Sequence, residues 1–335
     1  MRSEEASKSM KLVAAVELDN VSFEDQQPAQ VDSLADLLKG LGCAPKQINP
    51  RFFYDARGSE LFEKITQLPE YYPTRTEKAI LKHNAEDIAS LVGRHGVLIE
   101  PGSGNCEKVR LLLDALHPSA YIPLDISAEF LSASAWQLGK EFSWLNVQAV
   151  CADFSGPWQE HTQLPAGKRV VFYPGSTIGN MDPASARAFL SGLRPLIGPG
   201  GGVLIGVDLQ KSETVLNAAY NDAQGVTAAF NLNVLSAVNA IADADFQLDM
   251  FSHQAFYNTE RSRIEMHLIS KRKQTVNVGG IPVLFEQGES VHTENSYKYS
   301  LESFAELAAT AGLQVQRSWC DDGQLFSVHY LGVPE

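Results

Sequence analysis

The sequence predicts an α/β fold, in which a Rossmann-like, seven-stranded and mostly parallel sheet is combined with a second, smaller α+β domain. Between residues 76 and 210, short apolar runs alternate with helical patterns, as in folds built from strand–helix–strand units. The first of these runs opens into a Gly-x-Gly turn, which is typical of nucleotide-binding sheets. The alternation then stops, and residues 251–298 have the every-second-residue pattern of antiparallel strands.

Composition places the chain among globular proteins and excludes some partners. Its 335 residues are 44% hydrophobic, which is enough for two domains or one large one. The 40 acidic and 27 basic side chains give a net charge of −13, and such a field repels phosphate backbones and anionic lipids. We therefore expect neither nucleic acid nor a membrane as a partner. The oligomeric state is left open, with a monomer favoured.

The sequence also predicts a cytoplasmic protein. The apolar run near its start, Leu12 to Val16, is too short for a signal peptide, and no stretch of about 18 apolar residues follows. Four cysteines are widely spaced without a C-x-x-C pair, namely Cys43, Cys106, Cys151 and Cys320. Two of them lie in or beside predicted buried strands, so we interpret the set as reduced core thiols.

Aromatic residues gather in loops before the first strand of the sheet. Residues 1–30 are polar and predict a lightly attached tail, and the apolar spacing over 31–41 predicts a helix. The aromatic loops and the helix between them contain Phe53, Tyr54, Phe62, Tyr71 and Tyr72. For Phe53 and Phe62, packing in a helical cap is the alternative to a role in binding. Tyrosines in proline-flanked loops favour a pocket for a cationic or aromatic ligand.

Two helices are predicted around these loops. Ser59 is the expected cap of a helix that runs to Leu68 and stops at Pro69. Thr74 and Glu77 fit a capping box for a second helix, which extends to about residue 92.

The Gly-x-Gly turn is the first candidate for a ligand site. Residues 97–100 predict a buried parallel strand, and residues 107–116 predict the helix that follows. Gly102 and Gly104 let the backbone approach a ligand closely, and the helix start presents free N–H groups. A crevice of this kind suits a nucleotide-like cofactor, although a bare Gly-x-Gly is also found in ordinary tight turns.

Acidic residues end the next two predicted strands. The strand 121–125 ends at Asp125, about 20 residues after the turn, where nucleotide-binding folds place a carboxylate on the ribose hydroxyls. The strand 146–151 leads to Asp153 and Phe154, a polar group and a ring that suit an adenine. A helix cap or a turn residue is the alternative for Asp153.

A further strand, 169–173, opens into a loop of small residues that ends at Asn180. This loop falls at the carboxyl edge of the sheet, so Asn180 is expected to face the same crevice, with a turn role as its alternative. Asp182 and Pro183 predict the start of a helix that runs to about residue 197, and 202–208 predicts a fifth strand.

The last third of the chain leaves the sheet and returns to it. Residues 211–240 have a helical pattern with Tyr220 near the middle, and the alternation over 261–268 predicts a strand with one buried face. Met266 on that face is either core or pocket wall, and core is favoured. Residues 300–311 predict a helix, and two strands, 313–319 and 325–331, complete the larger sheet.

Seven strands, a nucleotide turn and a late antiparallel hairpin resemble the class I S-adenosylmethionine (SAM) methyltransferase fold. Several longer motifs resemble the histidine-specific methyltransferase family, which makes the trimethylated histidine betaine hercynine, the first intermediate of ergothioneine. The motifs that carry this resemblance are Phe53–Phe62, Leu68–Arg75, the Glu100 turn, Gly175–Asn180, Tyr220–Asp222 and Thr293–Ser296. The match covers about residues 30–333. It implies a substrate-binding domain of residues 31–75 and 211–298, and a SAM-binding domain of residues 76–210 and 299–335.

The resemblance implies a role for each site residue. Residues implied to contact SAM are Gly102, Ser103, Gly104, Lys108, Asp125, Ile126, Asp153, Phe154 and Gly175. Asn180 and Tyr220 are implied to hold the carboxylate of the substrate L-histidine. Glu294 and Ser296 are implied to bind its imidazole beside Tyr71 and Met266, while Tyr54 and Phe62 flank the amine and form the catalytic pair. The sequence departs from some relatives at Asn295, Tyr297 and Tyr299.

Methyl transfer to a neutral amine depends mainly on positioning, so no metal is expected, and His292 is the single histidine expected near the site. The alternatives are methylation of another amino acid, such as tryptophan, and a non-catalytic cofactor-binding subunit. Glu294 favours histidine over tryptophan, because a carboxylate suits an N–H donor ring and is costly beside a plain aromatic one.

Overall fold

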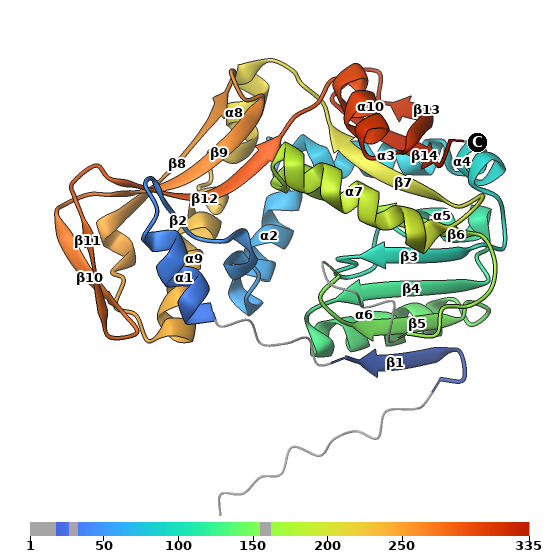
Figure 1. The fold of residues 1–335 in the computed structure, drawn as a ribbon, viewed down its shortest axis with the longest axis horizontal. Coiled ribbons are helices and arrows are strands. Elements are labelled where there is room, and N and C mark those ends of the chain that lie inside the picture. Colours follow the sequence, from blue (N-terminus) through green and yellow to red (C-terminus); the bar gives the residue numbers. More distant parts are fainter. Residues whose placement is uncertain (1–17, 27–32, 155–161, 335) are drawn as a thin grey trace, which may run out of the picture.

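The computed structural model describes residues 18–26, 33–154 and 162–334. Its larger sheet has eight strands in the order β1-β5-β4-β3-β6-β7-β14-β13 (Figure 1). Strand β14 runs antiparallel to both of its neighbours, and the other pairs are parallel. This arrangement confirms the predicted class I methyltransferase fold. The strands are β1 (Val21–Asp25), β3 (Val97–Pro101), β4 (Ala120–Asp125), β5 (Val147–Cys151), β6 (Arg169–Tyr173), β7 (Gly202–Asp208), β13 (Gln314–Cys320) and β14 (Phe326–Gly332).

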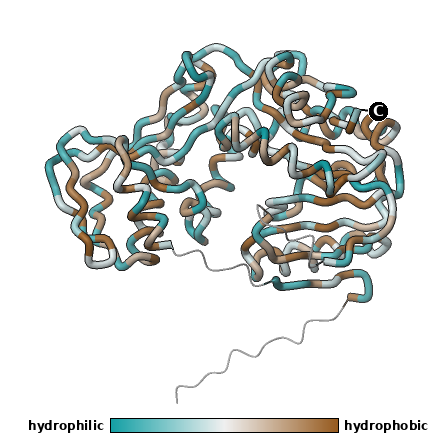
Figure 2. Tube along the Cα trace, viewed as in Figure 1, coloured by the Kyte–Doolittle hydropathy of each residue, from teal (hydrophilic) through white to brown (hydrophobic). Residues whose placement is uncertain are grey.

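Helices cover both faces of this sheet, which explains why its central strands are mostly apolar, as the hydropathy colouring of Figure 2 shows. In β3, Leu98 belongs to one hydrophobic cluster, whereas Val97 and Ile99 belong to the cluster on the opposite face. One face is covered by α3 (Tyr72–His83), α4 (Ala85–Val92), α5 (Arg110–Leu116) and α6 (Ala128–Glu141). The other is covered by α7 (Pro183–Ile197) and α10 (Leu301–Thr310).

A four-stranded sheet of order β2-β12-β9-β8 lies on the other side of the molecule (Figure 1). It contains β2 (Lys46–Gln47), β8 (Phe251–Asn258), β9 (Arg263–Ser270) and β12 (Ser290–Tyr297), and a hairpin of β10 (Gln274–Val278) and β11 (Ile281–Phe285) extends from it. A separate hydrophobic cluster joins this sheet to its helices. The helical segments are α1 (Ser33–Leu41), η1 (Pro50–Phe53), α2 (Ala56–Thr66), α8 (Glu213–Tyr220), α9 (Val226–Ala242) and η4 (Leu248–Met250). The predicted division of the chain into two domains stays a prediction.

The prediction of a loose tail over residues 1–30 is wrong for Val21–Asp25. This segment forms β1, an eighth strand that pairs in parallel with β5 at the edge of the sheet. The side-chain amide of Asn20 donates to the carbonyls of Gly139, Phe142 and Leu145 at 2.9–3.3 Å and so anchors its start. Backbone hydrogen bonds to β5 and the side-chain amide of Asn20 hold this strand in place. The strand therefore does not need the apolar pattern by which the sequence analysis recognised the other strands. Residues 1–17 and 27–32 lie outside the described ranges.

Three helix starts differ from the prediction. Asp55, rather than Ser59, caps α2, because its Oδ1 accepts from the N–H of Gly58 at 2.6 Å. The Thr74–Glu77 capping box is wrong, since α3 already begins at Tyr72, and Asn84 separates α3 from α4. The helix after the glycine turn begins at Arg110, three residues later than expected.

The remaining expectations can be checked quickly. Asp182 caps α7, and Ser300 caps α10. All four cysteines are free, but only Cys106 and Cys151 are buried. Among the described helices, none combines the length and the apolar character that crossing a membrane requires.

Gly206 in β7 provides a test of this packing. A Cβ at Gly206 would lie 2.0 Å from Oε1 of the buried Glu77. We expect Gly206→Ala to destabilise the fold by about 1–3 kcal/mol in chemical denaturation, because the carboxylate must move. Gly192→Ala on the exposed side of α7 meets no atom within 4 Å and serves as the control. It should be neutral or stabilising by up to about 1 kcal/mol. Equal stability of both variants would contradict the packing at Glu77.

Candidate functional site

The glycine turn and the end of β4 form one unit. Gly102 and Gly104 have φ angles of 68° and 54°, in the left-handed region that favours glycine. The N–H of Gly104 donates to Oδ2 of Asp125 at 3.2 Å, and the N–H of Ser127 donates to Oδ1 at 3.1 Å. Each carboxylate oxygen thus keeps a further lone pair for a ligand. The structure brings Asp125 beside the turn as the sequence predicts.

Apolar and polar groups around this turn suit a nucleotide-like cofactor. Ile126 is 55% exposed just after Asp125, and the ring of Phe154 lies 3.7 Å from the position of a Cβ on Gly102. The Oγ of Ser103 is buried without a hydrogen-bond partner. An exposed apolar side chain, an orphaned hydroxyl and an acidic acceptor together match a ligand with a flat ring and hydroxyl groups. Asp153 is exposed at the end of β5.

Glu77 joins the other two predicted cofactor residues, and the sequence analysis missed this role. Its buried carboxylate accepts from Nζ of Lys108 at 2.6 Å. It also accepts from the N–H of Gly175 at 2.9 and 3.0 Å. Because α3 starts early, Glu77 lies in its second turn and points toward β6 and β7 instead of capping the helix. Lys108 and Gly175 are therefore held together through one carboxylate.

The predicted aromatic residues form a continuous cluster with one additional ring. The centroids of Tyr54 and Phe62 lie 6.1 Å apart, and those of Phe62 and Tyr71 lie 6.4 Å apart. Tyr220 joins at 6.3 Å from Tyr71. The ring centroid of Phe230, from α9, lies 6.2 Å from that of Tyr54 and 6.0 Å from that of Phe62. The sequence did not reveal Phe230, because it lies in a helix whose residues are apolar on most sides.

Glu294 lies close to this cluster. Burial raises its pKa to about 7, although the nearby Lys298 opposes this shift. Among the described residues, none donates a hydrogen bond to its carboxylate. The pKa of Tyr54 is also raised, first by desolvation of its hydroxyl and then by the charge of Glu294. The Tyr54 side chain is nevertheless 48% exposed, so solvent reaches part of it. The carboxylate is thus available to a donor on a ligand.

Tyr220 and Ser296 meet at a buried ion-pair network. The Tyr220 hydroxyl donates to Oγ of Ser296 at 2.9 Å. Nζ of Lys298 donates to Ser296 at 2.7 Å, and it also lies 2.7 Å from Oδ2 of Asp208. Asp208 further accepts from Nζ of Lys211 at 2.6 Å and from the Tyr72 hydroxyl at 2.7 Å. The sequence analysis missed Lys298, although strand alternation places 294, 296 and 298 on one face.

The remaining predicted substrate residues flank this network. Met266 pairs with Glu294 across the β9–β12 ladder, and at 2% exposure it belongs to the hydrophobic core. Asn180 is half-buried at the end of η3 (Thr177–Asn180). A Cβ on the preceding Gly179 would meet the carbonyl of Tyr297 at 2.8 Å, so this turn is pressed against β12.

A β-bulge between His292 and Glu294 decides which residues face the site. His292 pairs with His267, whereas Glu294 pairs with Met266, so the two residues point to opposite faces of the sheet. His292 is therefore not near the site, contrary to the prediction. Asn295 and Tyr297 also point away, and the Tyr297 hydroxyl accepts from Arg263 at 2.7 Å.

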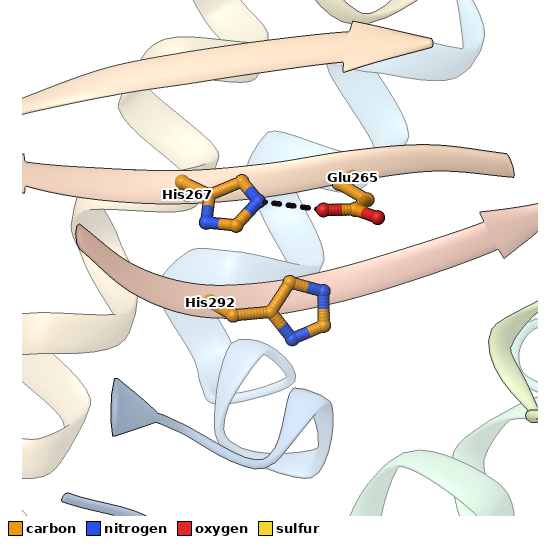
Figure 3. Close-up of side chains that lie close together, drawn as sticks. All are labelled: Glu265, His267 and His292. Carbon is orange, nitrogen blue, oxygen red and sulfur yellow. Dashed lines mark hydrogen bonds and ion pairs between the residues drawn. The ribbon is translucent and has the colours of Figure 1, made fainter. Parts of the chain in front are cut away.

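On this opposite face, Glu265, His267 and His292 lie close enough to share a divalent cation (Figure 3). Nε2 of His267 lies 3.1 Å from Oε2 of Glu265. The guanidinium of Arg263 contacts Oε1 of the same carboxylate at 2.7 and 2.8 Å and already supplies a positive charge there. Nδ1 of His267 is buried without a hydrogen-bond partner among the residues that the structure describes. The expectation that no metal takes part stays a prediction.

Comparison with known proteins finds a matching family and several similar chains. Residues 33–333 match the family described as histidine-specific methyltransferase, SAM-dependent. The chain is 44% identical over 303 residues to the histidine N-alpha-methyltransferase of Mycolicibacterium smegmatis, covering 87% of this chain and 93% of that protein. It is 42% identical over 301 residues to the protein of the same name from Mycobacterium tuberculosis, covering 88% and 92%. Ergothioneine biosynthesis protein 1 of Neurospora crassa is 31% identical over 307 residues, or 86% of this chain and 33% of that protein.

The raised pKa of Glu294 has a measurable effect on stability. Between its ordinary pKa near 4.5 and its folded pKa of about 7, the folded chain keeps a proton that the unfolded chain loses. Stability from this group is therefore lost as pH rises through that range. We expect Glu294→Gln to be more stable than the parent above pH 7, by up to about 3 kcal/mol, and equally stable below pH 4.5.

Denaturation curves at intervals between pH 4.5 and pH 8 measure this difference. Glu63→Gln removes the same charge from an exposed position of α2 and controls for net charge. A difference that does not change with pH, or that matches the control, would contradict the burial of an ionisable Glu294.

Proposed function

Because the chain belongs to the histidine-specific, SAM-dependent methyltransferase family, we propose that it transfers three methyl groups to the α-amino group of L-histidine, giving hercynine for ergothioneine biosynthesis. The chain is a SAM-dependent N-methyltransferase, and the two mycobacterial relatives described above are named histidine N-alpha-methyltransferases. The observation that carries the proposal is the unpaired Glu294 carboxylate beside the aromatic cluster. We also propose that the protein works in the cytoplasm as a monomer.

The groups around the glycine turn are suited to hold SAM. Asp125 accepts from the ribose hydroxyls, while Ile126 and Phe154 pack on the adenine, with Asp153 at its edge. Gly102, Gly104 and Gly175 have no side chains, so SAM can approach the backbone closely there. Ser103 and Lys108 face the amino acid end of SAM. SAM supplies a methyl group on a positively charged sulfur, which a neutral amine can attack without an activating base.

The substrate is held at both ends, and its amine is left to react. Asn180 and Tyr220 bind the carboxylate, Glu294 accepts the imidazole N–H, and Ser296 serves the second ring nitrogen. Tyr71 packs beside the imidazole, with Met266 behind Glu294. The amine then lies between Tyr54 and Phe62, where a fixed orientation supplies most of the rate acceleration.

Tyr54 is better suited to accept a hydrogen bond than to hold a negative charge. Its raised pKa keeps the hydroxyl protonated at neutral pH. The hydroxyl oxygen can accept a hydrogen bond from an N–H of the amine, and this bond fixes the direction of the nitrogen lone pair. Each methylation must still release a proton. The exposure of Tyr54 gives this proton a route to water, and no side chain needs to store it.

Glu294 and Ser296 together separate histidine from the alternative substrate, tryptophan. Both rings offer an N–H to Glu294, but the indole ring has no second nitrogen for Ser296. The direct experiment incubates the protein with SAM and a panel of amino acids and identifies products by mass spectrometry. Trimethylated histidine supports the proposal, methylated tryptophan supports the alternative, and no product in the presence of bound SAM supports a non-catalytic role.

Asp125→Ala tests the cofactor site. Loss of the ribose acceptor should weaken SAM binding by roughly 100-fold or more, because hydrogen bonds to charged groups contribute about 1.5–3 kcal/mol each. Isothermal calorimetry measures the affinity, and circular dichroism checks the fold. Asp114→Ala, on the exposed side of α5, is the control for charge and should bind SAM normally. Unchanged affinity in a folded Asp125→Ala protein would remove this assignment.

The aromatic cluster should matter more for the later methylations than for the first. Each added methyl removes an N–H donor, and contact of the methylated ammonium with the rings offsets this loss by roughly 0.5–2 kcal/mol. Tyr54→Ala and Phe62→Ala should therefore let mono- and dimethylhistidine accumulate in a mass-spectrometric time course. Phe246→Ala removes a ring elsewhere in the same hydrophobic cluster and is the control. Equal accumulation in all variants would contradict this role.

A further inference from the structure

A chain of hydrogen bonds joins the end of α8 to the β-bulge of β12. Nε2 of His253, on β8, lies 3.0 Å from the carbonyl of Tyr220, and its Nδ1 lies 2.9 Å from Nδ2 of Asn231 on α9. Oδ1 of Asn231 lies 2.7 Å from the hydroxyl of Thr293, the buried residue at the bulge. One end of the chain therefore carries Tyr220, and the other end carries Glu294, which directly follows Thr293.

The carbonyl of His267 fixes the direction of these hydrogen bonds. It lies 2.9 Å from Nδ2 of Asn231 and can only accept, so the amide of Asn231 must turn its NH2 group toward it. The second hydrogen of this NH2 group then points to Nδ1 of His253, which must be bare. The proton of the His253 ring is therefore on Nε2, and it is donated to the carbonyl of Tyr220.

His253 is suited to stay neutral in this position. Burial lowers its pKa, although the contact with the Tyr220 carbonyl and the charge of Asp222 oppose this shift. A second ring proton would point at the NH2 group of Asn231, so two donors would meet there. The ring is thus a fixed link with a donor at one end and an acceptor at the other.

Both ends of the chain satisfy backbone groups where regular structure is interrupted. The carbonyl of Tyr220 belongs to the last residue of α8, and carbonyls at a helix end have no acceptor role within the helix. The bulge interrupts the β9–β12 ladder, and beside it the carbonyl of His267 accepts from the side chain of Asn231. The chain therefore holds the end of α8 at a set distance from the bulge.

We propose that His253 and Asn231 are positioning residues that set the distance between the two ends of the substrate site. This inference rests on the proposed function, in which Tyr220 serves the carboxylate of histidine and Glu294 serves its ring. One CH2 group joins the α-carbon of histidine to its ring. A fixed distance between the two ends of the site thus favours histidine over an amino acid with a longer side chain.

The test compares His253→Leu, His253→Gln and Asn217→Ala. His253→Leu should raise the KM for histidine roughly 5- to 50-fold, because the carbonyl of Tyr220 loses a buried donor, while SAM affinity stays within about twofold. His253→Gln still offers an N–H to this carbonyl and should recover most of the loss. If His253→Leu does not fold, His253→Asn replaces it, because its shorter side chain reaches Asn231 but not Tyr220.

Asn217→Ala is the matched control at the same helix and strand. It removes another contact between α8 and β8, in which the N–H of Tyr257 donates to Oδ1 of Asn217 at 2.7 Å. The KM for histidine should stay within about twofold of the parent value. Equal KM values for His253→Leu and Asn217→Ala would mean that His253 only holds the helix on the sheet, which would overturn the inference.

Homohistidine, which has one extra CH2 group, provides a readout that a general loss of packing does not move. The ratio of kcat/KM for histidine to kcat/KM for homohistidine measures how strictly the distance is set. His253→Leu should lower this ratio by about fivefold or more, whereas Asn217→Ala should leave it unchanged. An unchanged ratio in a folded His253→Leu protein would overturn the inference.

A double-mutant cycle with Asn231→Leu identifies the route of the effect. Both substitutions break the same chain, so adding His253→Leu to Asn231→Leu should raise KM by no more than about threefold. Additive losses would show that the two residues act separately and would contradict the proposal.

The parent protein provides a readout that needs no substrate. NMR of ¹⁵N-labelled protein at pH 7 records the ring nitrogens of the eight histidines, and the spectrum of His253→Gln identifies those of His253. A protonated Nε2 with a bare Nδ1 supports the inference, and a protonated Nδ1 overturns it. If the parent forms no methylated histidine at all, the proposed function fails instead, which is a different result from a failure of this hydrogen-bond chain.

Discussion

The carboxylate of Asp208 connects segments that are far apart in the sequence. It lies at the end of β7, is 1% exposed, and accepts hydrogen bonds from Tyr72, Lys211 and Lys298. Its own N–H donates to Oγ of Ser176, in the loop that leads to Asn180. Burial opposes its ionisation, but the two lysines outweigh this effect and hold its pKa below the ordinary value. A buried carboxylate without partners is unstable, so the larger sheet, α3 and the strand of Glu294 depend on one another here.

The hydrogen bonds of Asp208 explain how charged groups can be buried beside the aromatic cluster. The network around Asp208 has its own counter-charges, whereas Glu294 has only the more distant field of Lys298. Glu294 is thus a desolvated carboxylate without a hydrogen-bond donor among the described residues, and a donor on a ligand would stabilise its charged form.

The sequence contains most of the fold because the central strands are buried on both faces. Runs such as 97–99 and 203–207 carry no charged or polar side chain, which is typical of a parallel strand covered on both faces. Strand β1 lacked this signal, since it lies at an edge and depends on backbone pairing. The same limit applies to the site. Asp125 is recognisable by its distance from the glycine turn, whereas Phe230 and Glu77 take part through tertiary contacts that no local pattern encodes.

Because of the bulge at Thr293, a deletion before Glu294 and an insertion after it have different effects on the residues that β12 presents. The Thr293 side chain is buried, and its hydroxyl lies 2.7 Å from Oδ1 of Asn231 and 3.0 Å from the carbonyl of Met266. Loss of this one residue would restore a regular ladder and leave Glu294 opposite Met266, because the bulge already accommodates the extra residue. Insertion of one residue after Glu294 would instead turn Ser296 and Lys298 to the Arg263 face. Length variation during the evolution of this strand is therefore compatible with activity on only one side of Glu294.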